Sequence, residues 1–164
     1  MTLENRQLLA IQFVISLVAW ASIASVFFAP RLACIDPRRA LRAWIAPQMF
    51  RVIGMTLLAK NVVGAGLDRD FAEAVALGDF TTSVLAIVTF VALSRPGRVP
   101  LVLAAITTIV GAGDLLRNLV VGMRANAAND IGVGWFIVSM LVPLMLVAHV
   151  GAGFAIRAVR RSSS

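Results

Sequence analysis

The chain has 164 residues, of which 60% are hydrophobic and 14% are charged, and its mean hydropathy is +0.91. Soluble domains of this length are about half apolar and about a quarter charged, so this composition argues against an ordinary soluble protein and indicates a membrane protein. The net charge of +7 does not indicate nucleic-acid binding, because the basic residues lie in short gaps between apolar runs, without interleaved aromatic residues.

Five apolar runs are long enough to cross a bilayer, since a hydrocarbon core about 30 Å thick needs roughly 20 helical residues. They cover residues 8–29, 48–67, 74–94, 100–122 and 131–155. The first run is longer than the apolar part of a secretory signal and has no basic start, so we expect a retained helix. The predicted fold class is therefore all-α: one domain, residues 1–164, forming a polytopic bundle of five transmembrane helices.

The segment between the first two runs, residues 34–47 (CIDPRRALRAWIAP), is rich in arginine. It is long enough for an amphipathic helix on the membrane surface, with Trp44 at the interface. A plain basic loop is the alternative. The single cysteine, Cys34, permits no intrachain disulfide, and the single histidine leaves no cysteine–histidine metal site, so we expect no bound metal.

The distribution of arginines predicts the orientation of the chain, because cytoplasmic loops carry an excess of basic residues. One set of gaps and ends holds Arg31, Arg38, Arg39, Arg42, Arg51, Arg95, Arg98, Arg157, Arg160 and Arg161. The alternate set holds Arg6, Arg69 and Arg124 together with Glu4, Asp68, Asp70, Glu73 and Asp130. The N-terminus is therefore predicted outside and the C-terminus in the cytoplasm, for a multi-pass protein of the cell inner membrane.

The tetrapeptide VGAG occurs three times, at residues 63–66, 110–113 and 150–153. A dinucleotide-binding fingerprint needs a third glycine and a strand before the helix, and both are missing. No cofactor is therefore expected. Small residues in membrane helices allow close backbone approach, which explains these repeats better.

Ionisable side chains inside the apolar runs predict a polar layer in the outer half of the bundle. At about 1.5 Å per residue, Asp79 and Arg117 lie roughly 7 Å below the outer ends of their helices, and Lys60 and Asp114 about 10–12 Å. Charges at such depth usually face the bundle interior and pair, so we expect an inward-facing neutral network. Its candidate catalytic residues are Asp79 and Asp114, and its candidate substrate-binding residues are Lys60, Asn61, Arg117 and Asn118.

His149 is predicted to lie toward the cytoplasmic end of the last run, far from this layer, with Arg51 the only charged residue at a similar depth. A proton relay from His149 to the layer would need a water path across the bilayer centre, so a hydrogen bond to a helix backbone is the favoured role. Pro143 in the same run is expected to kink the helix and open space beside it.

The second run carries a motif of its own in FRVIGMTLLAK, where Arg51 is followed by Gly54 and Lys60. This motif resembles the start of the DoxX-like small integral membrane proteins, and the general layout extends over residues 48–158. The resemblance implies a four-helix membrane protein to which the run 8–29 is an addition. The glycine that commonly precedes the lysine in that group is replaced here by Leu57 or Leu58. The group includes accessory subunits of redox systems, so the resemblance leaves the function open.

Three hypotheses for function follow from the polar layer. The first is a membrane-embedded enzyme that isomerises or cyclises a lipophilic small molecule by acid–base chemistry at Asp79 and Asp114. The second is a non-catalytic accessory subunit, in which the layer fixes helix register and a membrane-protein partner packs on small-residue faces. The third is a small-solute carrier or channel, which five helices and shallow charges do not favour.

Overall fold

The computed structural model describes residues 3–162, and every regular element in that range is helical. Four stretches are long and apolar enough to cross a membrane: Asn5–Ala33, Arg69–Ala92, Val99–Arg124 and Gly134–Ser162. The predicted all-α fold is therefore confirmed, and four helical stretches have the length and composition of membrane spans. The predicted second run, 48–67, is not among these four stretches.

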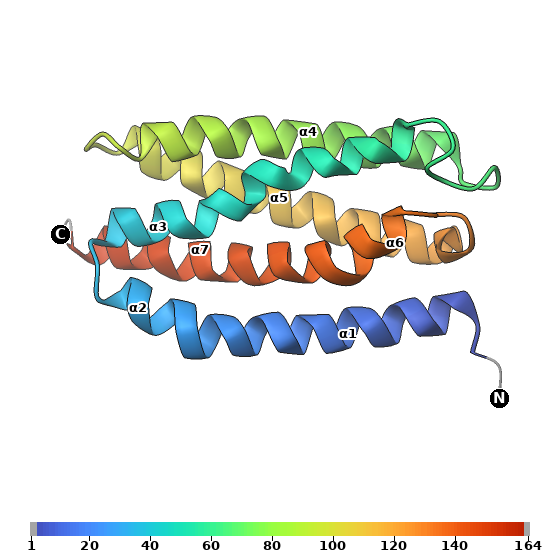
Figure 1. Ribbon diagram of the computed structural model, residues 1–164. Coiled ribbons are helices and arrows are strands. Elements are labelled where there is room, and N and C mark those ends of the chain that lie inside the picture. The colour runs from blue at the N-terminus through green and yellow to red at the C-terminus, as the bar shows by residue number, and fades with distance from the viewer. Residues whose placement is uncertain (1–2, 163–164) are drawn as a thin grey trace.

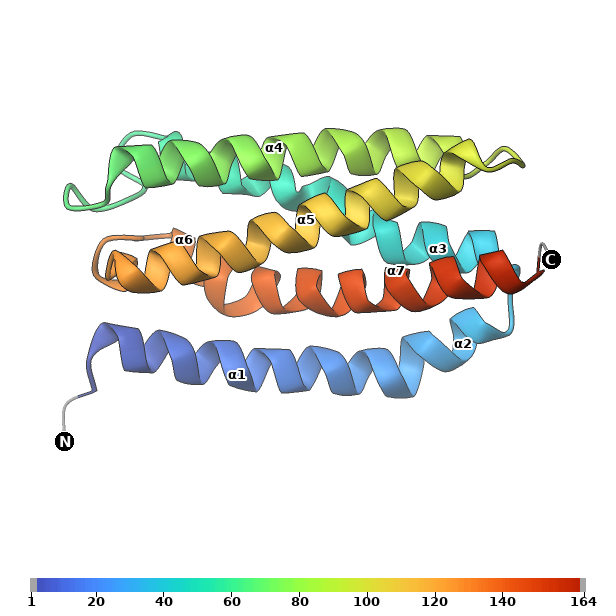
Figure 2. The ribbon, with the colours of Figure 1, turned by 180° about the vertical axis from the view of Figure 1, so that it is seen from behind.

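Helical segments lie side by side and alternate in direction along the chain, so that the two ends of the chain lie at opposite ends of the bundle (Figure 1). The elements are α1 (Asn5–Ile23), η1 (Ala24–Phe28), α2 (Ala29–Ala33), α3 (Pro37–Ile45), η2 (Ala46–Leu58), α4 (Arg69–Ala92), α5 (Val99–Arg124), η3 (Ala127–Asn129), α6 (Gly134–Phe136), η4 (Ile137–Leu141) and α7 (Val142–Ser162). The view from behind shows α1 along the outer side of α7, with α4 and α5 on the other side of the bundle (Figure 2).

The second helical segment differs from its prediction in both position and geometry. It begins at Pro37 as α3 and continues directly into η2, a 3-10 helix that ends at Leu58. Together α3 and η2 run the length of the bundle, with α3 against α7 and η2 against α4 (Figure 1). Most of the stretch 34–47 is therefore helical rather than a plain loop, and Ala40, Leu41 and Ile45 of α3 are buried against the rest of the bundle.

The 3-10 geometry of η2 suits the spacing of its polar residues. The buried residues of η2 are Gln48, Arg51 and Gly54, three apart, and a 3-10 helix aligns every third side chain on one edge. An α-helix would turn each of them about 60° away from the one before. Ser83 of α4 holds the segment in place, because its Oγ accepts from Val52 N (2.8 Å) and donates to Met49 O (2.7 Å).

Prolines explain two irregular turns in the longest helices. The π-helical segments η1 and η4 each end two residues before a proline, Pro30 and Pro143 respectively. Proline lacks the N–H that would bond to the carbonyl four residues earlier, and its ring crowds that carbonyl. Residues 26 and 139 carry those carbonyls and lie inside the wide turns, so the distortion expected at Pro143 takes this form.

The core combines alanines with larger aliphatic residues and lies where α3, α4, α5 and α7 meet. Its buried members are Leu41, Ile45, Ala86, Leu93, Ala104, Ala152, Ala155, Ile156 and Val159. By contrast α1 contributes no buried residue. It is fastened by two indoles: Trp20 Nε1 donates to Met140 O (3.1 Å), and Trp135 Nε1 donates to Gln12 Oε1 (2.6 Å).

Candidate functional site

A single buried arginine joins three elements near the middle of the bundle. Arg51 of η2 donates from Nε to Asp79 Oδ1 on α4 (2.7 Å) and from Nη2 to Asp114 Oδ2 on α5 (2.5 Å). Its Nη1 donates to the carbonyl of Gly111 on α5 (2.8 Å). The side chain of Arg51 is only 2% exposed, so its charge is offset by these partners rather than by solvent.

Glycines make room for the two carboxylates. A Cβ on Gly54 would overlap the carboxylate of Asp79, and a Cβ on Gly78 would overlap that of Asp114. Both glycines therefore allow a carboxylate to lie directly against the backbone of a neighbouring helix. Asp79 itself lies on the inward stripe of α4, which explains why it reaches Arg51 from near the midpoint of that helix.

The three ionisable groups do not balance in charge. One guanidinium faces two carboxylates, so the cluster of Arg51, Asp79 and Asp114 carries one net negative charge when both acids are ionised. An uncompensated charge is costly in a low-dielectric interior. Neutrality would require one more proton or cation, which makes the cluster suited to holding and releasing a proton.

The sequence predicts that His149 lies far from the acidic residues, and this prediction is wrong. His149 of α7 lies beside the cluster. Its ring packs against Gly111, where an added Cβ would meet His149 Nε2 at 2.8 Å and the methyl group of Thr82 at 2.8 Å. Both ring nitrogens and Thr82 Oγ1 are buried and have no hydrogen-bond partner within residues 3–162. Gly111 therefore connects the two halves of the site, with its carbonyl bound to Arg51 and its Cα against His149.

The predicted network is correct for its two acids and wrong for the groups around them. Lys60 and Asn61 lie exposed in the turns that follow η2, outside the bundle interior. Arg117 is exposed on α5, and its hydrogen bond is to the neighbouring Asn118 (Nη1 to Oδ1, 3.3 Å). None of these four residues contacts the cluster. Lys60 and Asn61 miss it because the second helical segment begins and ends about ten residues earlier than predicted. Arg117 and Asn118 lie on α5 as predicted, but they bond to each other.

The prediction for Arg51 is wrong. The sequence analysis counts Arg51 among the arginines at the cytoplasmic ends of the apolar runs, but its side chain is buried and binds Asp79. Two signals were available to find it. The spacing of Gln48, Arg51 and Gly54 fits a period of three, and Arg51 and Gly54 also belong to the motif that resembles DoxX-like proteins. The structure gives both residues a shared purpose, since one binds the two carboxylates and the other makes space for Asp79.

Comparisons with known proteins give one match. No curated protein and no solved structure matches the chain. The resemblance to DoxX-like proteins stays a prediction. A family model described as a domain of unknown function, DUF8737, covers residues 8–157 and so includes every residue of the cluster. The chain belongs to this DUF8737 family.

Proposed function

We propose that this protein is a membrane-embedded enzyme that performs acid–base chemistry on a lipophilic molecule at the cluster of Arg51, Asp79 and Asp114. The observation that carries the proposal is the sharing of one buried guanidinium by two carboxylates. In the low dielectric of a bilayer, such a cluster holds a proton that a bound substrate can accept and return.

The roles within the cluster differ with exposure. The Asp114 side chain is 14% exposed and that of Asp79 is 10% exposed, whereas Arg51 is enclosed. Asp114 is therefore assigned the proton transfer to and from substrate. Asp79 and Arg51 act as positioning residues that orient the Asp114 carboxylate.

Isomerisation or cyclisation is the reaction class that fits a site made of one guanidinium and two carboxylates. A double-bond shift takes one proton from a carbon and returns one to another, so atoms and electrons balance without a redox partner. A cyclisation that adds a proton at one carbon and loses one elsewhere balances in the same way. His149 is assigned as a second proton acceptor, because its ring packs against Gly111, whose carbonyl binds Arg51.

The proposal includes five membrane crossings with the N-terminus outside. With rises of about 1.5 Å per α residue and 2.0 Å per 3-10 residue, α3 and η2 reach about 40 Å, enough for a 30 Å hydrocarbon core. The arginines that flank the α2–α3 turn, those of the α4–α5 turn and those at the end of α7 lie at one end of the bundle (Figure 1). The excess of basic residues supports assigning that end to the cytoplasm, in the cell inner membrane.

The test uses solvent deuterium, because the substrate is not needed in pure form. Membranes containing the protein are incubated with a total lipophilic extract in deuterated water, and products are compared by chromatography and mass spectrometry. Wild-type protein is expected to convert one compound into an isomer that carries one solvent deuterium. Arg117→Gln, on the same helix but outside the cluster, is expected to behave like wild type, whereas Asp114→Asn loses the conversion.

Two outcomes would overturn the proposal. One is conversion by Asp114→Asn at the wild-type rate. The other is the absence of any deuterium-labelled isomer with wild-type protein across extracts from the native host. Unfolding midpoints in detergent are measured for all three proteins, so that loss of folding is separated from loss of chemistry.

A second candidate is an accessory subunit of a membrane complex, and α1 is the observation that favours it. This helix contributes no buried residue, and its Val14, Ile15 and Val18 are more than half exposed. A partner helix could cover that face. Extraction in mild detergent would then give a stoichiometric partner, and Val14→Ala with Val18→Ala would release it without changing the unfolding midpoint.

A further inference from the structure

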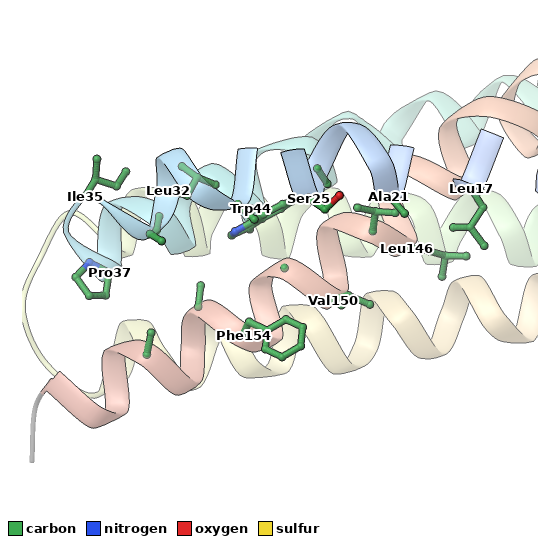
Figure 3. A pocket seen from close by; sticks show the side chains of 18 residues that line it. Leu17, Ala21, Ser25, Leu32, Ile35, Pro37, Trp44, Leu146, Val150 and Phe154 are labelled. Carbon is green, nitrogen blue, oxygen red and sulfur yellow. The ribbon is translucent and has the colours of Figure 1, made fainter. Parts of the chain in front are cut away.

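An apolar groove of about 720 Å³ runs between α1–α2 and α7, with α3 forming one wall. Figure 3 shows Leu17, Ala21 and Ser25 across from Leu146, Val150 and Phe154, with Trp44 beside Ser25 in this view. The volume falls within the range of small-molecule sites, roughly 300–1,000 Å³. Ser25 is the one hydroxyl among its lining side chains, so the occupant must be hydrocarbon along most of its length.

The groove is formed by specific packing. Trp20 and Trp135 fasten α1 to the segment before α7, and beyond them α1 continues through η1 and Pro30 into α2. Trp44 closes the inner wall, because its indole lies directly over Gly151, where a Cβ would overlap the ring.

One end of the groove is cationic. Its lining residues Ile35, Pro37 and Ala40 surround Arg38 and Arg39 in the sequence, and Arg157 lies over the ring of the lining residue Phe154, with its guanidinium carbon 5.9 Å from the ring centroid. Arg38 is engaged by the carbonyls of the α4–α5 turn. Arg39 and Arg157 are exposed. The nearest acid in the sequence, Asp36, accepts the backbone N–H groups of residues 38 and 39 as the cap of α3.

We propose that this groove binds one acyl chain of an anionic glycerophospholipid from the bilayer, with the phosphate at Arg39 and Arg157. The inference is independent of the proposed acid–base chemistry. From Leu146 to Ala158 the α7 wall extends about 18 Å, close to the roughly 15 Å depth of one bilayer leaflet. Basic pockets between transmembrane helices are typical sites for anionic headgroups.

A lipid chain fits this groove better than a protein helix does. A helix about 10 Å across and 18 Å long occupies about 1,400 Å³, roughly twice the volume of the groove. A lipid also meets both features at once, since its chain matches the apolar walls and its phosphate matches the arginines at one end.

Trp44 supplies a built-in probe for the test. The full-length protein is reconstituted in phosphatidylcholine vesicles that contain increasing fractions of dibrominated phosphatidylglycerol or dibrominated phosphatidylcholine, and tryptophan fluorescence is recorded. The Trp44 contribution is the difference between wild type and Trp44→Phe. We expect it to be quenched by the anionic lipid at a mole fraction on the order of tenfold lower than by the zwitterionic lipid.

Matched variants locate the headgroup. Arg39→Gln with Arg157→Gln is expected to abolish the anionic preference, whereas Arg95→Gln with Arg98→Gln, at the same end but outside the groove, keeps it. Ala158→Phe, which fills part of the groove without adding a tryptophan, is expected to lower quenching of Trp44 by both lipids. Equal quenching by the two lipids in wild type, or an unchanged preference after loss of Arg39 and Arg157, overturns the proposal. Absence of any Trp44 quenching would instead indicate a protein occupant, such as a second copy, and overturns it as well.

Discussion

The guanidinium of Arg51 stabilises the charges of two buried carboxylates, which at the protein surface would be stabilised by water. It gives each acid a charge-assisted hydrogen bond and donates from Nη1 to the carbonyl of Gly111. Removing one partner of such a buried pair is far more costly than never having formed it, because the other charge is left unpaired. The charge count of the cluster makes this cost unequal for its three members.

Arg51→Met should therefore lower the free energy of unfolding by about 3–5 kcal/mol, since two carboxylates lose their only cation. Asp114→Asn should cost only about 1 kcal/mol, because the amide oxygen can still accept from Arg51 and the remaining pair is neutral. Unfolding by dodecyl sulfate in mixed micelles measures both values. Equal losses in the two variants would show that the cluster does not carry an excess negative charge.

Glycines beside the cluster provide a second test at the same scale. Gly54→Ala and Gly78→Ala each place a methyl group into a carboxylate, and we expect each to destabilise the protein by about 1–3 kcal/mol. Gly113→Ala is the matched control, because nothing lies within 4 Å of its added Cβ. This control should be neutral or stabilising by up to about 1 kcal/mol, since alanine favours helix. Thermal unfolding of the three variants in one detergent decides the comparison.

At the scale of elements, η2 is a long 3-10 helix whose stability comes from its neighbours. Runs of more than three or four residues in this geometry are uncommon, because their hydrogen bonds are poorly aligned. Ser83 compensates by bonding to the backbone at Met49 and Val52, and Gln48 Nε2 donates to Met145 O of α7 (3.1 Å). The element that carries Arg51 is thus held by tertiary contacts with α4 and α7.

Ser83→Ala should loosen η2 selectively. The amide of Val52 loses its acceptor, so residues 46–58 are expected to exchange hydrogen faster, by on the order of tenfold, while α5 keeps its protection. Hydrogen–deuterium exchange in detergent micelles measures both segments. Ser22→Ala is the control, since Ser22 bonds only to the carbonyl of Val18 within its own helix. Equal exchange rates of residues 46–58 in Ser83→Ala and in wild type would contradict this account.

The contact between α4 and α5 includes a buried hydroxyl pair, Thr89 Oγ1 and Thr107 Oγ1, 2.8 Å apart. Interhelical hydrogen bonds in membrane proteins average about 0.6 kcal/mol in double-mutant cycles. A cycle of Thr89→Val, Thr107→Val and the double variant should therefore give a coupling energy near that value. A coupling of zero would mean that Thr107 is satisfied by the carbonyl of Leu103 alone.

For the whole molecule, the proposed five crossings put the α2–α3 turn and the η2–α4 turn on opposite sides of the membrane. Native Cys34 is exposed in the first turn, and Ala65 is exposed in the second. In intact cells an impermeant maleimide is expected to label Ala65→Cys in a Cys34→Ser background, but not Cys34 itself. Ser94→Cys in the same background, at the α4–α5 turn, should be protected like Cys34. Labelling of Cys34 and Ala65→Cys from the same side would mean that η2 does not cross.

From composition and apolar runs alone, the sequence predicts a membrane environment and the positions of most helices. Apolar runs separated by arginines specify membrane helices whatever their neighbours are, so the four long helical stretches lie close to their predicted ranges. Asp79 and Asp114 were recognisable for the same reason, because acids deep within an apolar helix must find partners.

The partner that Asp79 and Asp114 share, Arg51, follows only from the packing of the helices. The second segment contains Pro47, Gly54 and several polar residues, so its local sequence does not fix whether it begins near residue 37 or residue 48. Packing of Leu41 and Ile45 into the core and the bonds from Ser83 settle that register. Because the segment covers residues 37–58 rather than 48–67, Arg51 lies inside the bundle instead of at its edge. For the same reason Lys60 lies in the turn after the segment instead of within it.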